Sequence, residues 1–404
     1  MTTITDPPQE SFRLSMLLND TRYRSLTFQA IAAILLALSI FYLGNNLIQN
    51  LRQAGLNISY DFLGDPAGYD INQTLIEYSS QSTHARAALV GILNTLLVAF
   101  LACVTATVFG VLAGVLRLSK NWLVAKLMAV YVEIFRNIPV LIWIIIIFTI
   151  MTVVLPGPRA FRGEDPEATM LLGAFAFTNR GIYIPGPIWG PGSLVVVATF
   201  IASLVAIFAY RRYATNLLYA EGKLLPVFWP SIALFFVPTI AMFFVMGSPI
   251  TLDFPALRGF NFAGGIKIGG PLIALWFALS IYTGAFIAEN VRAGIQAVSK
   301  GQTEAAGALG LRPGRIMNLV VLPQALRVII PPLISQYLNI TKNSSLAIAV
   351  GYADITATLG GITLNQTGRA IECVLLLMLF YLTISLLISA VLNVYNASIK
   401  LKER

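Results

Sequence analysis

Long apolar stretches alternate with shorter polar ones along almost the whole chain. Each apolar stretch approaches the ~20 residues that a helix needs to cross a bilayer. We therefore expect about eight transmembrane helices, within residues 26–43, 87–116, 127–155, 194–210, 227–247, 272–291, 328–350 and 373–394. The first stretch starts late, is long for a signal peptide and lacks a following Ala-x-Ala-like site, so we interpret it as a retained anchor helix.

Composition agrees with a membrane protein. Of 404 residues, 57% are hydrophobic and only 11% are charged, and mean hydropathy is +0.77; a typical soluble protein has about 25% charged residues. An ordinary soluble enzyme is therefore excluded. The net charge of +9 would suit a nucleic-acid partner, but basic cytoplasmic loops explain it better in a membrane protein. Two cysteines and one histidine indicate neither a disulfide framework nor a metal site.

The basic residues also predict an orientation. With the N-terminus inside the cell, 17 of the 27 basic residues fall in cytoplasmic segments and seven in the opposite loops. This bias predicts cytoplasmic N- and C-termini. It also places the loop after residue 291 in the cytoplasm.

The segment 301–323 is too polar and too often interrupted by glycine and proline to be a span. We predict a short helix over 302–309, with Thr303 as its N-cap, Glu304 in its first turn and Gly310 at its C-terminal cap. Pro313 opens a second short helix, and Pro323 perturbs the chain before the next span. The two helices should form a compact surface element.

This segment resembles the EAA loop of ABC importer permeases, through Glu304-Ala305-Ala306, Gly310 and Leu322-Pro323. Val320 stands where that family usually has Ile. The resemblance implies that the loop docks into a groove on a cytoplasmic ATPase, and an inter-span helix without a partner is the alternative. The residues that it assigns to coupling are Gly301, Gln302, Glu304, Ala305, Ala306, Gly307, Gly310, Leu322 and Pro323.

Two further blocks, 91–147 and 272–394, resemble the core of polar-amino-acid-type permeases. The resemblance implies an all-α polytopic protein with a five-helix type I core, plus one N-terminal and two inserted helices. The run 179–185 resembles the general L-amino-acid importer permeases. We divide the chain into 1–85 (cytoplasmic N-terminus, first span and periplasmic loop), 86–155 (first part of the core), 156–270 (insertion with periplasmic loops) and 271–404 (second part, with the coupling loop at 292–327).

Two charge pairs lie near the expected cytoplasmic ends of spans. Glu133 and Arg136 are three residues apart, as are Glu289 and Arg292, so each pair can meet on one helix face. Charges within a membrane are costly, which favours a substrate or gating contact. A structural ion pair at the interface is the alternative, and we prefer it because side chains at helix ends reach water.

A second polar group falls within the expected span 328–350, which also contains a Pro-Pro pair. Lys342, Asn343, Ser344 and Ser345 offer donors for a substrate carboxylate if the helix is broken there. Alternatively, Lys342 reaches the interface and the hydroxyl groups bond to their own backbone. Asn94, Thr95 and Tyr282 complete the candidate substrate pathway, with helix packing as their alternative role.

No phosphate-binding Gly-x-x-x-x-Gly-Lys-Ser/Thr loop or other catalytic motif is present, so we do not expect an enzyme. The resemblance implies the permease subunit of an ABC importer for L-amino acids in a bacterial inner membrane. Its implied partners are membrane lipid, an ATPase dimer that binds ATP and Mg, a second permease that is a paralogue, and a periplasmic amino-acid-binding protein. The alternatives are an ion- or proton-coupled secondary transporter of a small polar solute, and a membrane enzyme or scaffold. The secondary transporter would need titratable groups deep in the spans and an inverted repeat.

Overall fold

A computed structural model describes residues 18, 21–53, 55, 57–163 and 165–399. Four basic residues that contribute to the expected charge bias, Arg13, Lys400, Lys402 and Arg404, lie outside the described residues. The chain divides into two units, residues 1–61 and 62–404.

The first unit contains one long helix, α2 (Thr21–Gln53). This helix includes the expected span 26–43 and continues beyond it at both ends. Apolar side chains such as Leu36 and Phe41 are exposed along it. An apolar helix without internal packing is suited to a lipid environment.

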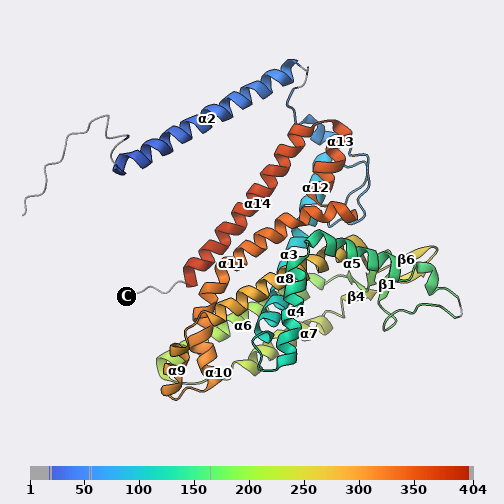
Figure 1. Ribbon diagram of the computed structural model, residues 1–404. Coiled ribbons are helices and arrows are strands. Elements are labelled where there is room, and N and C mark those ends of the chain that lie inside the picture. The colour runs from blue at the N-terminus through green and yellow to red at the C-terminus, as the bar shows by residue number, and fades with distance from the viewer. Residues whose placement is uncertain (1–17, 19–20, 54, 56, 164, 400–404) are drawn as a thin grey trace, which may run out of the picture. The chain divides into compact units, whose positions relative to one another are not determined.

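Helices α3 (His84–Leu116) and α8 (Gly270–Gln296) form the centre of the second unit (Figure 1). Small residues allow them to approach closely. A Cβ atom added at Gly110 would lie 2.5 Å from the Cβ of Ile287, and one added at Gly114 would lie 2.7 Å from the carbonyl oxygen of Ala288. Such small residues are typical of helix contacts in membranes, where packing replaces the hydrophobic effect.

The expected span 127–155 is not one helix. It consists of α4 (Trp122–Asn137) and α5 (Val140–Val154), which meet at an angle of 105°. Ile138 is extended because the ring of Pro139 disfavours a helical residue before it, and Pro139 then caps α5. Both helices pack against α8.

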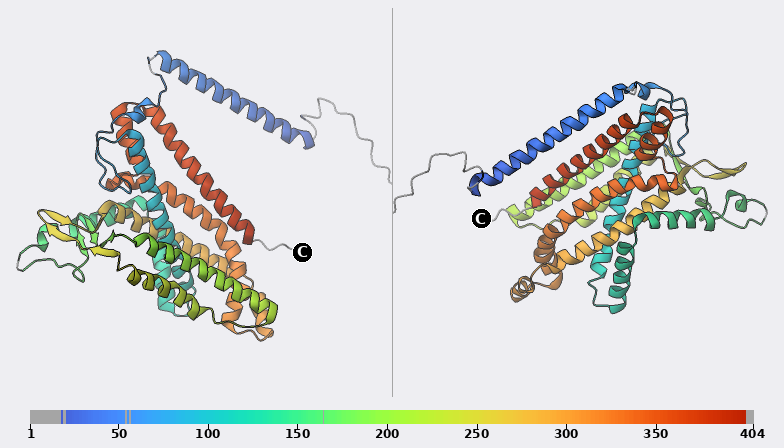
Figure 2. Two further views of the ribbon diagram at one scale, coloured as in Figure 1. Left: turned by 180° about the vertical axis from the view of Figure 1, so that it is seen from behind. Right: turned by 45° about the horizontal axis from the view of Figure 1, so that its top comes forward.

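The insertion contains the two expected helices, which form a hairpin, and short strands that the sequence does not predict. Helices α6 (Ser193–Glu221) and α7 (Phe228–Val245) lie side by side (Figure 2). Two antiparallel pairs join strands from the two sides of the hairpin: β2 (Gly181–Ile184) with β7 (Ile266–Gly269), and β3 (Gly186–Trp189) with β4 (Ile250–Asp253). Two more pairs each lie on one side of it: β1 (Ala176–Thr178) with β2 before α6, and β5 (Ala256–Arg258) with β6 (Asn261–Ala263) after α7. The insertion thus returns the chain to the start of α8.

The region 313–350 also differs from expectation. Helix α10 (Pro313–Ile316) is not a separate short helix, because a π-helical turn, η3 (Met317–Val321), joins it to α11 (Leu322–Asn343). Pro331 and Pro332 lie inside α11 and do not end it. The helix changes at Ser344, where a 3₁₀ segment, η4 (Ser344–Val350), begins.

Four shorter elements and one long helix complete the unit: α9 (Lys300–Ala308), α12 (Ile355–Ala357), the π-helical η5 (Thr358–Thr363), α13 (Leu364–Thr367) and α14 (Ala370–Ile399). Two 3₁₀ turns, η1 (Asp61–Gly64) and η2 (Pro158–Phe161), lie in the loops. Among the described residues, seven helices are long and apolar enough to span a membrane, or eight if α4 and α5 make one broken span. The predicted polytopic helical class is confirmed.

Candidate functional site

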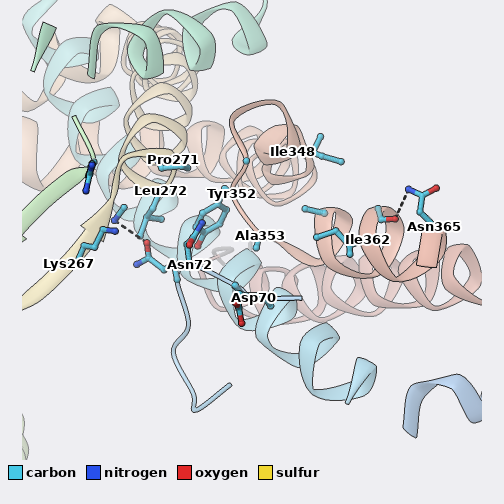
Figure 3. Close-up of a pocket in the computed structure, with 17 residues that line it drawn as sticks. Asp70, Asn72, Lys267, Pro271, Leu272, Ile348, Tyr352, Ala353, Ile362 and Asn365 are labelled. Carbon is cyan, nitrogen blue, oxygen red and sulfur yellow. Dashed lines mark hydrogen bonds between the residues drawn. The ribbon is translucent and has the colours of Figure 1, made fainter. Parts of the chain in front are cut away.

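A cavity of about 600 Å³ lies where the insertion meets the core of the second unit. One wall comes from the strands of the insertion, another from the loop before α3, and a third from the segment between η4 and α13. Figure 3 shows Lys267 and Asp70 on different sides of it, with Asn72 and Tyr352 between them. Its volume is within the usual range for small-molecule sites.

Three charged side chains line this cavity, and the sequence analysis did not single out any of them as a site. Lys267 belongs to β7, Arg180 immediately precedes β2, and Asp70 lies in the loop before α3. All three are exposed. Within the described part of the chain, neither cation forms an ion pair. The sequence offers one indication of these residues: all three are charged and lie in loops that are expected on the same side of the membrane.

Asn94 and Thr95 do not line the cavity, but Asn94 bonds to two residues that do, Gln73 and Ala353. The fully buried Asn94 Nδ2 donates hydrogen bonds to the carbonyl oxygens of Gln73 and Ala353, both at 2.9 Å. Thr95 Oγ1 accepts a bond of 3.1 Å from the backbone N–H of Ile355. These contacts attach α3 to the loop before it and to the start of α12, as expected for polar residues that join membrane helices.

Two buried oxygens in this part of the protein have no hydrogen-bond partner among the described residues: Asn94 Oδ1 and Asp354 Oδ2. Asp354 lies between two spans and is fully buried, and its other oxygen caps α12 by accepting from the N–H of Ala357. Burial raises the pKa of the Asp354 carboxyl to about 6, against backbone hydrogen bonds that lower it. Unpaired buried acceptors are uncommon and are places where a cationic group would be stabilised.

The remaining expected pathway residues do not line the cavity either. Ser344 Oγ donates to the carbonyl oxygen of Thr341 at 2.7 Å, and Ser345 Oγ to that of Lys342 at 2.8 Å. The hydroxyl groups thus bond to their own helix. Lys342 is exposed, and Asn343 ends α11. Tyr282 packs at the edge of the core, with its ring 5.1 Å from that of Phe286.

Of the two expected charge pairs, Glu289 with Arg292 forms and Glu133 with Arg136 does not; Glu133, Glu289 and Arg292 belong to one network near the C-terminal end of α8. Glu289 accepts hydrogen bonds from both Arg292 and Arg117, the latter at the end of α3. Glu133 pairs with Arg117 at 3.6 Å rather than with Arg136, whose guanidinium carbon lies 5.2 Å from the ring centre of Phe286. The network joins α3, α4 and α8, because Arg117 reaches across from a third helix.

The expected coupling helix is α9 (Lys300–Ala308), and it begins two residues earlier than predicted. Ser299 is its N-cap, whereas Thr303 lies inside the helix and donates to the carbonyl oxygen of Lys300. Gly310 ends it in the left-handed region at φ +78°, as predicted. The N–H groups of Gly310 and Leu311 bond to the carbonyl oxygens of Gly307 and Ala306, which is the Schellman arrangement.

One face of α9 is open. Glu304 and Ala305 are exposed, Leu309 is 83% exposed, and Ala306 is buried against the rest of the chain. A Cβ atom added at Gly301 or Gly307 would meet no atom within 4 Å. The predicted pair Leu322-Pro323 opens α11 and follows the π-helical turn, while Gln302 is exposed in the first turn of α9.

Comparison with known proteins agrees with these features. Residues 222–401 match the family model described as "Binding-protein-dependent transport system inner membrane component". The glutamate/glutamine/aspartate/asparagine transport system permease protein BztB of Rhodobacter capsulatus is 51% identical, over 100% of both chains. The general L-amino acid transport system permease protein AapQ of Rhizobium johnstonii is 46% identical, over 98% of this chain and 96% of that protein.

A third relative is the putative amino-acid ABC transporter permease protein YhdX of Escherichia coli, which is 44% identical over 94% of this chain and 95% of its own length. These relatives are permease subunits and not enzymes, and they do not favour the secondary transporter. Identity at this level along the whole length shows the family. The chain belongs to the inner membrane permease components of binding-protein-dependent ABC transport systems.

Proposed function

We propose that this chain is the permease subunit of an ABC importer that moves L-amino acids across a bacterial inner membrane, with both termini in the cytoplasm. The open face of α9 is the observation that carries the proposal. ATP and Mg bind to a separate ATPase dimer, and a paralogous permease and an external amino-acid-binding protein complete the transporter.

The composition of α9 supports a contact with a partner. Glycine inside a helix costs about 1 kcal/mol relative to alanine, and no described residue of the chain lies close enough to Gly301 or Gly307 to require it. A protein surface that approaches the helix backbone would require it. The exposed Leu309 and Glu304 supply an apolar and an acidic contact for such a surface.

Helix α8 supports a path for the mechanical coupling. Its 27 residues span ~40 Å at 1.5 Å per residue. The strand β7 that carries Lys267 directly precedes it, and three residues separate its end from the start of α9. ATP-driven movement of α9 therefore acts on a rigid helix whose other end borders the cavity. The coupling requires that the ATPase favour one of two arrangements of these helices.

The cavity supports an amino-acid substrate. A zwitterion needs donors for its carboxylate and acceptors for its ammonium group, and Arg180, Lys267 and Asp70 provide both kinds. The names of the three full-length relatives refer to amino-acid transport. We retain Lys342, Asn343, Ser344 and Ser345 as candidates for a later stage of the pathway, because α11 changes to a 3₁₀ segment there.

The test compares two leucines with the same exposure. Leu309 follows α9 and Leu224 lies in the α6–α7 connection, which the charge bias places on the same side; both are 83% exposed. We expect Leu309→Ser to lower ATPase copurification and ATP-driven uptake in proteoliposomes at least several-fold, with Leu224→Ser unchanged. A Leu309→Ser protein with normal uptake would contradict the proposal, as would wild-type uptake that an ion gradient drives without ATP.

A further inference from the structure

We propose that the 600 Å³ cavity is an outer selectivity site for amino acids with a second carboxylate, and that Arg180 and Lys267 determine this selectivity. The inference rests on the proposed function and extends it to a substrate class and to a role for the insertion 156–270. The class is an L-amino acid with an acidic side chain.

The charges around the cavity match this class. Two cations and one carboxylate, Arg180, Lys267 and Asp70, face one space. An acidic amino acid carries two carboxylates and one ammonium group, which is the complementary set. A neutral amino acid carries one of each and would leave one cation without a partner. Complementary charge contributes more to the choice between ligands than to the affinity for any one of them.

Both cations come from the insertion. Among the described lining residues outside the insertion, Asp70 in the loop before α3 is the only charged side chain. Without the insertion the cavity would therefore have a net negative charge and would repel an anionic solute. The two cations of the insertion make the net charge of the lining positive, and both lie on the wall that the insertion forms.

The local structure holds the two cations in place. Lys267 lies opposite Tyr183 in the β2–β7 pair. Arg180 lies in the tight turn before β2, where its N–H donates to Thr178 Oγ1 at 3.2 Å. Its guanidinium donates one bond, of 3.3 Å, to the carbonyl oxygen of Phe260, which leaves other donors for a ligand.

The sheet is also joined to the wall that carries the carboxylate. The N–H of Gly269, two residues after Lys267, donates to Gln73 Oε1 at 3.2 Å. Gln73 is three residues from Asp70 on the loop before α3, and its carbonyl oxygen accepts from Asn94. Gln73 therefore links the two walls: its side chain accepts from the main chain of β7, and its main chain accepts from Asn94 of α3. These bonds favour one separation of the walls before a ligand enters.

The experiment measures uptake of glutamate and glutamine by the complete transporter in proteoliposomes, with saturating binding protein. These two substrates have nearly the same shape and differ in one charge. We expect Arg180→Gln or Lys267→Met alone to lower the glutamate-to-glutamine ratio of kcat/KM about threefold, and both together about tenfold, because exposed ion pairs contribute little each. The preference should also weaken at high salt.

Two variants serve as controls. Lys267→Arg keeps the charge and should keep the ratio. Arg258→Gln removes a cation from β5 of the same insertion, outside the cavity lining, and should also leave the ratio unchanged. An equal loss for both substrates in the double variant would indicate a structural or docking role and overturn the inference, as would an unchanged ratio. In both cases ATP-driven glutamine uptake by the wild-type complex would still establish the proposed function.

Discussion

Gly91 on α3 offers a direct test of how closely α3 packs against the segment 354–358, which contains α12. A Cβ atom at this position would overlap Thr358 Oγ1 and would lie 2.9 Å from two main-chain atoms, the carbonyl oxygen of Asp354 and the Cα of Ile355. Thr358 is fully buried and its hydroxyl donates to the carbonyl oxygen of Asp354, so it has little freedom to move. Forcing one methyl group into such a contact costs about 1–3 kcal/mol.

We expect Gly91→Ala to lower the melting temperature of the purified complex in detergent by roughly 2–6 °C. Adding Thr358→Ala should recover part of this loss, since it removes the hydroxyl but leaves the two main-chain atoms. Gly44→Ala is the matched control, because that glycine within α2 has no atom within 4 Å, and it should not destabilise. If Gly91→Ala melts with the wild type, the close approach of these segments is not a packed contact and the reasoning fails.

Three further predictions concern charge and backbone conformation. Glu289→Gln removes the carboxylate that pairs with two partly buried arginines, Arg117 and Arg292, and should lower the free energy of unfolding by about 1–3 kcal/mol; an unchanged thermal midpoint would contradict the network. The folded pKa of Asp354, about 6, is above its unfolded value, so its contribution to stability is present below pH ~4 and is lost as pH rises through 6. Asp354→Asn should therefore stabilise the protein above pH 6 and have little effect near pH 4, and melting curves that change equally at both pH values would refute this. Gly310→Val places a β-branched residue at φ +78°, at a cost of about 1–2 kcal/mol, and should impair ATP-driven uptake more than membrane expression. Uptake that falls only in proportion to expression would contradict a role of the Gly310 cap in coupling.

Local signals determine much of this protein. The length and apolarity of its segments predict the membrane helices, because a bilayer demands about 20 apolar residues from any spanning helix. Gly310 and Pro313 mark the end of α9 and the start of the next helix, since each acts through its own backbone geometry. The resemblance of 301–323 to a coupling loop depends on the same short-range pattern, and the full-length relatives confirm the family that it implies.

Tertiary structure decided the features that depend on distant partners. Pro331 and Pro332 suggest a break in α11, but the helix continues through both. A proline in the sequence does not show whether the surrounding structure accommodates the backbone hydrogen bonds that it removes. Arg117, from a third helix, pairs with the acidic member of each expected charge pair, Glu133 and Glu289, while Arg136 lies against Phe286 instead. The cavity is the clearest case: Asp70 and Lys267 are 197 positions apart and carry no pattern of their own. They share one space only because the strands of the insertion pair across the α6–α7 hairpin and return the chain to α8.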